Sequence, residues 1–531
     1  MKRLKNIVFW QRTIGLILLL YCLFRIGMVN YIDYTLEKVI ENNAEKGISL
    51  SYEDINVGWI LSSVSIYNLK FIGQNNQDTV FRVEVGQARI NSIKVKDLLF
   101  SKRLKILNLD FIYVTVTTWA GRHLPQSEES GIRMNKLFKR LKVDKILFKE
   151  LLWRHLDEEG KLEAMITTEN LNLDGLRLLQ RDKGIPAMSL DGLQNSDLNF
   201  EFPGNKHRYQ VGNIVYNRTD SSLIVNNIHI IPLLDKVAFS NYFKSQQDRI
   251  SGVSREIKFS GLSILDTMGI HLHSRSMDLT FELEVYRNKR YPFTRKRTVL
   301  LPSEMFKRVG FLFDVDSVRL RDGFVAYEEL NIKDRNPGRI FFQDIDMDAF
   351  HFTNDSAEAD NIFYATGNFM GQGRVEAEIT MPLGYGKDYR IKGACSSFEL
   401  KEVNSILKST YLVDIKSGIL DKMAFDFTYN IRKSKGVVDF KYSDLKVHVY
   451  NAKDTDKKSF LKSWAMNQFI RINKIGDASL TGKINFERNP SRSVFYYWSK
   501  SLLYGLKDAL IKNGAINPKF NKSKTFILDD G

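Results

Sequence analysis

The pattern of apolar and polar positions changes its period near Gly47. The segment "YIDYTLEKVIENNAEKGISL", which starts at Tyr31, carries its apolar residues at helical spacing and predicts a connecting helix over 32–47. Beyond it, apolar and polar residues alternate in segments such as "VSIYNLKFIG", "LKILNLDFIYVTVTTW" and "GVVDFKYSDLKVHVY", with turn-forming residues at their ends. Short helices are predicted only at 134–142, 303–309 and 401–407. The pattern therefore predicts a mainly β protein, built as an elongated, twisted antiparallel sheet with one apolar face.

An apolar sheet face has to be buried against helices, a second sheet or a ligand. Few amphipathic helices are available between residues 50 and 460, so we expect the sheet to curl into a hydrophobic groove, with or without lipid inside. For any single residue, ordinary sheet core is the competing interpretation. The residues expected to line the groove and contact acyl chains are Ile66, Leu69, Phe71, Leu107, Leu109 and Phe111.

A short motif recurs along the chain, in the forms "NLKF", "NLDF", "NLNLDGL", "SLDGL" and "RLRDGF". One interpretation is that hairpins reuse Asx-Gly turns. The other is a repeated sheet unit stacked laterally. No Pro/Ser-rich linker or low-complexity tract interrupts the pattern, so we expect one β-groove body over 48–488.

The N-terminus combines basic residues with an apolar run. Lys2, Arg3, Lys5 and Arg12 precede the run from Ile14 to Phe24. A cleaved signal peptide would need a small-x-small site, which "RIGMVNYID" does not offer. We therefore expect a basic cytoplasmic segment (1–12), an uncleaved transmembrane signal anchor (13–31) and everything after it on the far side of the membrane.

The C-terminal segment 489–531 contains "NPSRSVFYYWSKSLLYGLKDALIK", which predicts an amphipathic helix capped by Asn489 or Ser491. Its expected apolar face consists of Phe495, Trp498, Leu502, Leu506 and Leu510. The favoured interpretation is a capping helix that packs this face on the last strands and closes the end of the sheet. The alternative is an interfacial helix on a membrane surface at the mouth of the groove.

The formal net charge of +16 invites a nucleic-acid interpretation, but no nucleic-acid-binding motif accompanies it, and we expect no nucleic acid partner. The one basic cluster without a carboxylate runs from Arg287 to Arg297. It is either a solvated hairpin loop or a site for anionic lipid headgroups. The membrane-surface candidates are Arg287, Lys289, Arg290, Arg295, Lys296, Arg297 and Trp498.

Candidate chemistry is sparse. His271 and His273 share a face if they lie on a strand, but only Asp278 offers itself as a third metal ligand. Asp314 and Asp316, and the run Asp344, Asp346 and Asp348, are expected on a solvated face, and the latter run lacks the glycine of an EF-hand loop. The two cysteines, Cys22 and Cys395, are not expected to form a disulfide. We expect no catalytic site, no metal and no cofactor.

Taken in order, several segments resemble the AsmA-like and DUF748-like proteins of Gram-negative envelopes, particularly uncharacterised bacteroidete-type members. These segments are the anchor, "GISLSYEDINVGWILSSVSIYNLKFIG", "LIVNNIHIIPLLDKVAFSNYF", "VDSVRLRDGFVAYEEL" and "GKINFERNPSRSVFYYWSKSLLYGLKDAL". The resemblance implies an inner-membrane-anchored periplasmic protein whose β-groove is similar to those of bridge-like lipid transfer proteins.

From this resemblance we expect a role in phospholipid transport or outer-membrane biogenesis, with membrane phospholipids and envelope proteins as partners. A second hypothesis is a structural or regulatory envelope protein that assists outer-membrane protein assembly through edge-strand pairing, without carrying lipid. A third hypothesis is a membrane-tethered hydrolase, but the chain contains no sequence motif that supports it.

Overall fold

The computed structural model divides the chain into two compact units, Met1–Thr219 and Asp220–Gly531, and each is described by itself. Most of the predicted cytoplasmic segment, anchor and connecting helix (1–12, 13–31 and 32–47) lies outside the residues that the structure describes, which there are only Ile26, Gly27, Asn30, Tyr34 and Gly47. From Gly47 onward the described ranges are 47–58, 63–75, 78–93, 103–122, 140–179, 187–266, 270–294, 298–331, 336–355, 360–384, 386–411, 413–449 and 479–512.

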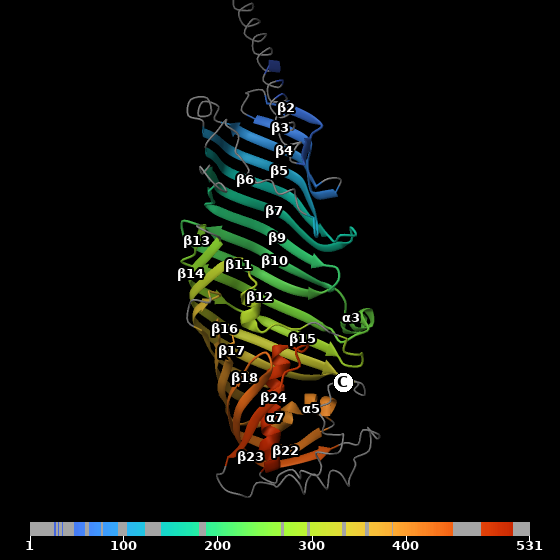
Figure 1. The fold of residues 1–531 in the computed structure, drawn as a ribbon, viewed down its shortest axis with the longest axis vertical. Coiled ribbons are helices and arrows are strands. Elements are labelled where there is room, and N and C mark those ends of the chain that lie inside the picture. The colour runs from blue at the N-terminus through green and yellow to red at the C-terminus, as the bar shows by residue number, and fades with distance from the viewer. Residues whose placement is uncertain are drawn as a thin grey trace, which may run out of the picture. The chain divides into compact units, whose positions relative to one another are not determined.

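The first unit is built of strands that lie side by side (Figure 1). They are β1 (Ile48–Ser51), β2 (Asp54–Val57), β3 (Ser63–Asn75), β4 (Asp78–Ile93), β5 (Arg103–Trp119), β6 (Arg140–Leu156), β7 (Leu162–Leu179), β8 (Ala187–Ser189), β9 (Gly192–Phe202) and β10 (His207–Asn217). Both β1 and β2 pair with β3, and pairing then follows chain order to β7. Strand β7 pairs with β8 and β9, and β9 with β10.

The prediction of a purely antiparallel sheet is wrong, because β5 and β6 run parallel. Parallel neighbours need a crossover of a dozen or more residues, and the stretch 120–139 supplies that length. The predicted helix at 134–142 is also wrong at its end, since Arg140 to Lys142 begin β6. Its first part, 134–139, lies outside the described residues.

The second unit is also mainly β. Its strands are β11 (Ser222–Pro232), β12 (Asp248–Ser260), β13 (Ser263–Asp266), β14 (Ile270–Leu279), β15 (Glu282–Asn288), β16 (Leu312–Leu330), β17 (Gly338–Thr353), β18 (Asn361–Phe369), β19 (Gly373–Met381), β20 (Tyr389–Cys395), β21 (Phe398–Glu399), β22 (Val413–Tyr429), β23 (Lys433–Val449) and β24 (Leu480–Glu487). Here too the pairing is mixed, because β16 runs parallel to both β14 and β15, whereas β16 to β20 pair antiparallel in chain order.

The helices described in the second unit are short except the last. They are α3 (Lys236–Phe243), α4 (Pro302–Phe306), the 3₁₀ turn η1 (Leu400–Val403), α5 (Asn404–Tyr411) and α7 (Val494–Lys512). The helices predicted at 303–309 and 401–407 are confirmed as α4 and as η1 with α5. The sequence interpretation missed α3, whose N-terminus is capped by Asp235 through hydrogen bonds from the amides of Val237 and Ala238.

Many strands contain an internal residue in the left-handed backbone region, which marks a local irregularity within the strand rather than a turn. The non-glycine residues of this kind inside strands are Asn68, Ser92, Tyr113, Glu150, Asp197, Asn227, Asp322, Asp344, His351 and Asp444. Two forms of the recurring motif contain such a residue: Asn68 in "NLKF" and Asp322 in "RLRDGF". The hairpin-turn interpretation is therefore wrong at these positions. Asn and Asp recur there because they tolerate this conformation better than other residues with a side chain.

Helix α7 packs on β23 and β24 (Figure 1). This confirms the expectation that the C-terminal helix contacts the last strands, and Ser493 rather than Asn489 or Ser491 caps it, by accepting a hydrogen bond from the Tyr496 amide. Phe495 was expected on the buried face but is 69% exposed. The most buried positions are instead Tyr497, Ser501 and Ala509. Among the described residues, no helix combines the length and hydropathy that a membrane span needs.

Candidate functional site

One face of the first unit carries apolar side chains in rows that run across the strands from β3 to β10. Partners in the strand register lie on the same face of the sheet, so each chain of partners defines one row. Row 1 consists of Val64, Ile90, Leu109, Ile146, Leu173, Leu193 and Tyr216. Row 2 consists of Ile66, Ala88, Phe111, Phe148, Leu171, Asn195 and Ile214.

Two further rows lie on the other side of row 2. Row 3 consists of Leu69, Val85, Val114, Leu151 and Thr168. Row 4 consists of Phe71, Val83, Val116, Trp153, Ile166, Phe200 and Tyr209. Side chains from all four rows pack together, for instance those of Val64, Ile66, Leu69 and Val83. Within row 2 the rings of Phe111 and Phe148 stack at 5.0 Å between centroids. We call rows 1 to 4 the apolar face.

Strict alternation does not hold along these strands, because each steps by three residues between rows 2 and 3. In β3 the step runs from Ile66 to Leu69 across Asn68, and in β5 from Phe111 to Val114 across Tyr113. A similar irregularity in β5 places Ile106, rather than Leu107, in a cluster with Leu109. Five of the six predicted groove residues thus lie in rows 1 to 4, and Leu107 lies between rows.

The two faces of the first unit differ in chemistry. The register on the opposite face includes a row of mainly polar residues, Lys70, Glu84, Thr115, Leu152, Thr167, Asn199 and Gln210. No helix occurs between residues 47 and 219 in the parts that the structure describes, so the partners named for the apolar face all come from the sheet. In the second unit, by contrast, α7 covers the corresponding hydrophobic cluster with Tyr497, Trp498 and Leu502.

Row 2 is interrupted by one polar side chain, Asn195, which is only 4% exposed. Its Oδ1 accepts a hydrogen bond from the Ile214 amide at 2.7 Å. Among the residues that the structure describes, its Nδ2 has no hydrogen-bond partner. A buried donor left unsatisfied costs about 1–3 kcal/mol, so this position favours an occupant that brings an acceptor. The sequence offered no signal for Asn195, because a polar residue at that place resembles an ordinary strand position.

The basic cluster is partly neutralised within the second unit. Arg287 makes a two-pronged ion pair with Asp248, at 2.7 and 2.8 Å, and Lys289 pairs with Glu329 at 2.8 Å. Asp248 also raises the pKa of the Arg287 guanidinium, against the lowering effect of burial. Arg290 donates from Nε to the Asn331 carbonyl at 3.4 Å. The remaining candidates, Arg295, Lys296 and Arg297, lie outside the described residues.

Trp498, the aromatic membrane-surface candidate, lies on α7 in the main hydrophobic cluster of the second unit. Its ring is 5.9 Å from that of Tyr429 on β22, at an angle of 71°. Burial raises the pKa of Tyr497, on the preceding position of the helix, to about 12. Trp498 is therefore a packing residue in this structure.

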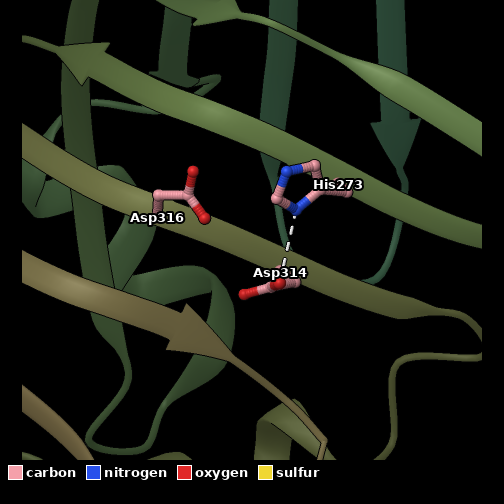
Figure 2. Close-up of side chains that lie close together, drawn as sticks. All are labelled: His273, Asp314 and Asp316. Atoms are coloured by element: carbon pink, nitrogen blue, oxygen red, sulfur yellow. Dashed lines mark hydrogen bonds and ion pairs between the residues drawn. The ribbon is translucent and has the colours of Figure 1, made fainter.

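Strands β14 and β16 bring together residues that the sequence kept apart (Figure 2). His273 is the register partner of Asp314, and its Nδ1 lies 3.3 Å from the Asp314 Oδ2. Asp316 completes a group whose ligand atoms all lie within 4.8 Å of one another. Asp278, the third ligand considered from sequence, instead pairs with Arg319 at 2.6 Å.

This group of His273, Asp314 and Asp316 was missed because its members come from strands about forty residues apart. The sequence showed a pair of alternating histidines and a pair of alternating aspartates. Only the parallel pairing of β14 with β16 places His273 beside the two aspartates. His271, two residues earlier on β14, is not a member of the group.

The comparisons with known proteins name no relative for this arrangement: the chain matches no protein-family model and no curated protein sequence.

Proposed function

We propose that the apolar face of the first unit holds the acyl chains of membrane lipids. In this proposal the chain is an AsmA-like envelope protein, anchored in the bacterial inner membrane by residues 13–31 and otherwise periplasmic. It contributes to phospholipid transport or outer-membrane biogenesis and performs no catalysis, because lipids exchange along an apolar track by diffusion.

The observation that carries the proposal is the continuity of the rows. Neighbouring strands lie about 4.8 Å apart, so a row crossing seven strands extends roughly 29 Å. The hydrocarbon core of a bilayer is about 30 Å thick, so one acyl chain of a single leaflet extends roughly 15 Å. Each of the rows that crosses seven strands is thus long enough to accompany an extended acyl chain over its full length.

Two further features support a lipid over a purely structural role for this face. No helix is described between residues 47 and 219 of this unit, and large apolar side chains such as Leu109, Phe111 and Phe148 are only partly buried. In addition, the Nδ2 of Asn195 lacks an acceptor within an otherwise apolar row. The ester carbonyl of a glycerolipid is an acceptor attached to apolar chains, and it would satisfy this donor without breaking the apolar contact.

The test uses the full chain in its native membrane, with a photo-reactive phenylalanine analogue at Phe111 in one variant and at Tyr113 in the other. Phe111 lies in row 2, whereas Tyr113 lies in the same strand, has a left-handed backbone conformation and is 61% exposed. We expect lipid adducts, identified by mass spectrometry, at Phe111 and not at Tyr113.

Adducts confined to the chain itself at Phe111 would mean that the face is ordinary sheet core. Equal lipid labelling at both positions would mean non-specific contact with the membrane. Crosslinks from Phe111 to another envelope protein, without lipid, would favour the assembly role. Each of these results overturns the proposal.

A further inference from the structure

The group of His273, Asp314 and Asp316 has the composition of a metal site and lies in the second unit (Figure 2). His273 projects from β14, and Asp314 and Asp316 project from β16 at positions two residues apart. Side chains two apart on a strand lie on the same face, and the parallel register places His273 directly beside Asp314. Three donors of two chemical types therefore converge from two strands.

The separations suit one ion bound between them. Two ligand atoms at about 2.1 Å from a tetrahedral zinc ion lie roughly 3.4 Å apart. The Nδ1 of His273 and the Oδ2 of Asp314 are already 3.3 Å apart, which is longer than most direct hydrogen bonds. With all donor atoms of the group within 4.8 Å of one another, changes of side-chain rotamer can close the remaining distance without moving the strands.

The charges around the group point the same way. Two of the other aspartates on β14 and β17 are compensated by arginine: Asp278 pairs with Arg319, and Asp348 pairs with Arg321 at 2.7 Å. In the part of the chain that the structure describes, neither Asp314 nor Asp316 makes an ion pair with lysine or arginine. Two neighbouring carboxylates without such a partner repel each other, and a divalent cation relieves that repulsion.

We propose that His273, Asp314 and Asp316 bind a divalent first-row transition-metal cation, of which Zn²⁺ is the representative. The mixture of one imidazole and two carboxylates suits this class, whereas Ca²⁺ and Mg²⁺ prefer oxygen ligands alone. His273 and Asp314 are partly exposed, so the coordination positions that the protein leaves open are filled by water. The ion joins β14 to β16 and so stabilises the parallel pairing of two strands distant in the sequence.

This inference is independent of lipid binding and is tested with Zn²⁺ alone. The full chain, purified in detergent and stripped with a chelator, is titrated with Zn²⁺ by calorimetry, and its thermal unfolding is followed with and without the ion. We expect one saturable equivalent per chain and a higher unfolding temperature with Zn²⁺. Co²⁺ in place of Zn²⁺ should give visible absorption bands that report the coordination number.

The variants His273→Ala and Asp316→Asn should each weaken binding by about tenfold or more, because each removes one of three protein ligands. Two matched controls, His271→Ala and Asp278→Asn, remove a histidine and an aspartate from the same strand outside the group and should bind like the unaltered chain. Circular dichroism shows whether each variant folds, and Asp316→Asn remains informative if His273→Ala does not.

Absence of saturable binding overturns the proposal. So does unchanged binding in both His273→Ala and Asp316→Asn. An equal loss in His271→Ala overturns the assignment of these three ligands.

Discussion

Gly482 on β24 and Gly505 on α7 meet backbone to backbone. A Cβ atom added to Gly482 would lie 1.9 Å from the carbonyl oxygen of Gly505 and 2.8 Å from the amide nitrogen of Ala509. A Cβ atom on Gly505 would lie 2.6 Å from the Cγ1 of Val438 on β23. The backbones of the helix and of β24 therefore touch at this point, and the side chains of Val438 and Ile484 pack against Gly505 beside it.

Gly482→Ala is accordingly expected to destabilise the second unit, because the helix has to move away from the sheet to admit the methyl group. We expect a loss of about 1–3 kcal/mol in the free energy of unfolding, measured by denaturant titration. Gly310→Ala is the matched control, since nothing lies within 4 Å of a Cβ atom there. A Gly482→Ala variant as stable as the control would contradict the close approach.

Trp498→Ala should lower stability more than it lowers membrane affinity. The ring packs in the main cluster of the second unit, and removing a large aromatic side chain from a core costs about 3–5 kcal/mol. Phe495→Ala removes an exposed aromatic from the same helix and should have little effect on stability. Thermal unfolding and liposome flotation of both variants measure the two effects. The reverse ranking would return α7 to the membrane-surface interpretation.

Cys395 should react slowly with alkylating reagents in the folded protein. Burial raises the pKa of its thiol to about 11, and the thiolate is the reactive form. In a Cys22→Ser variant, which leaves Cys395 as the only cysteine, iodoacetamide at pH 8 should label the native chain much more slowly than the denatured chain. Similar rates in both states would show that the thiol is accessible.

The ion pair between Asp426 and Arg390 should contribute stability that depends on pH. Hydrogen bonds from Arg390 at 2.6 and 2.9 Å lower the pKa of Asp426 below its ordinary value. Because the folded-state pKa is the lower one, the contribution is complete above the unfolded pKa of about 3.9 and disappears as the pH falls through the folded pKa.

Melting temperatures of the unaltered chain and of Asp426→Asn should therefore differ at neutral pH and converge in acid. Added salt should reduce the difference, since the pair is largely exposed. A difference that persists unchanged at low pH would assign the effect to something other than the charge.

Asn195→Asp should reduce the amount of lipid that crosslinks at Phe111. The substitution keeps an acceptor for the Ile214 amide but replaces the unpartnered donor with an anionic oxygen. Asn199→Asp is the matched control, because Asn199 lies on the same strand in the polar row. Equal lipid yields from the two variants would remove Asn195 from the lipid contact while leaving the apolar rows as they are.

The sequence predicted the class of the fold and five residues of the apolar face. Alternation identified the strands, and Ile66, Leu69, Phe71, Leu109 and Phe111 all fall in the rows. The alternation could still be recognised because each three-residue step offsets the pattern by only one residue. The strands are long enough to show the alternation on both sides of the step. Leu107 shows the limit: extrapolation by twos from Leu109 passes through an irregular step, where Ile106 joins the cluster instead.

Four of the five residues on the predicted face of α7 pack against the hydrophobic clusters, namely Trp498, Leu502, Leu506 and Leu510, but the most buried positions lie one residue earlier on the helix. Hydrophobicity counted the large side chains and favoured the line through Phe495 and Trp498. The packing instead centres on Ser501, Gly505 and Ala509, because small residues let the helix approach the strands closely. The small size of these side chains, rather than their hydrophobicity, determines how the helix contacts the strands. A pattern of hydrophobic positions does not predict such a contact.

Long-range pairing was beyond the sequence for a different reason. Whether two strands run parallel depends on the path of the connection between them, which alternation does not record. The meeting of His273 with Asp314 follows only from the parallel pairing of β14 and β16. For the same reason the sequence could suggest Asp278 as a ligand, although the fold pairs it with Arg319.

The three-residue steps occur at the same place in neighbouring strands of the first unit, so these strands change together which residues face the apolar side. The residues on each side of the step, such as Ile66 and Leu69 in β3 or Phe148 and Leu151 in β6, stay in register only because the neighbouring strand skips at the same place. Deleting Asn68 alone would turn one half of β3 inside out while leaving its neighbours unchanged. An insertion or deletion at this step therefore keeps the apolar face in register only when the neighbouring strands change with it, which ties the evolution of the face to a single line of aligned steps.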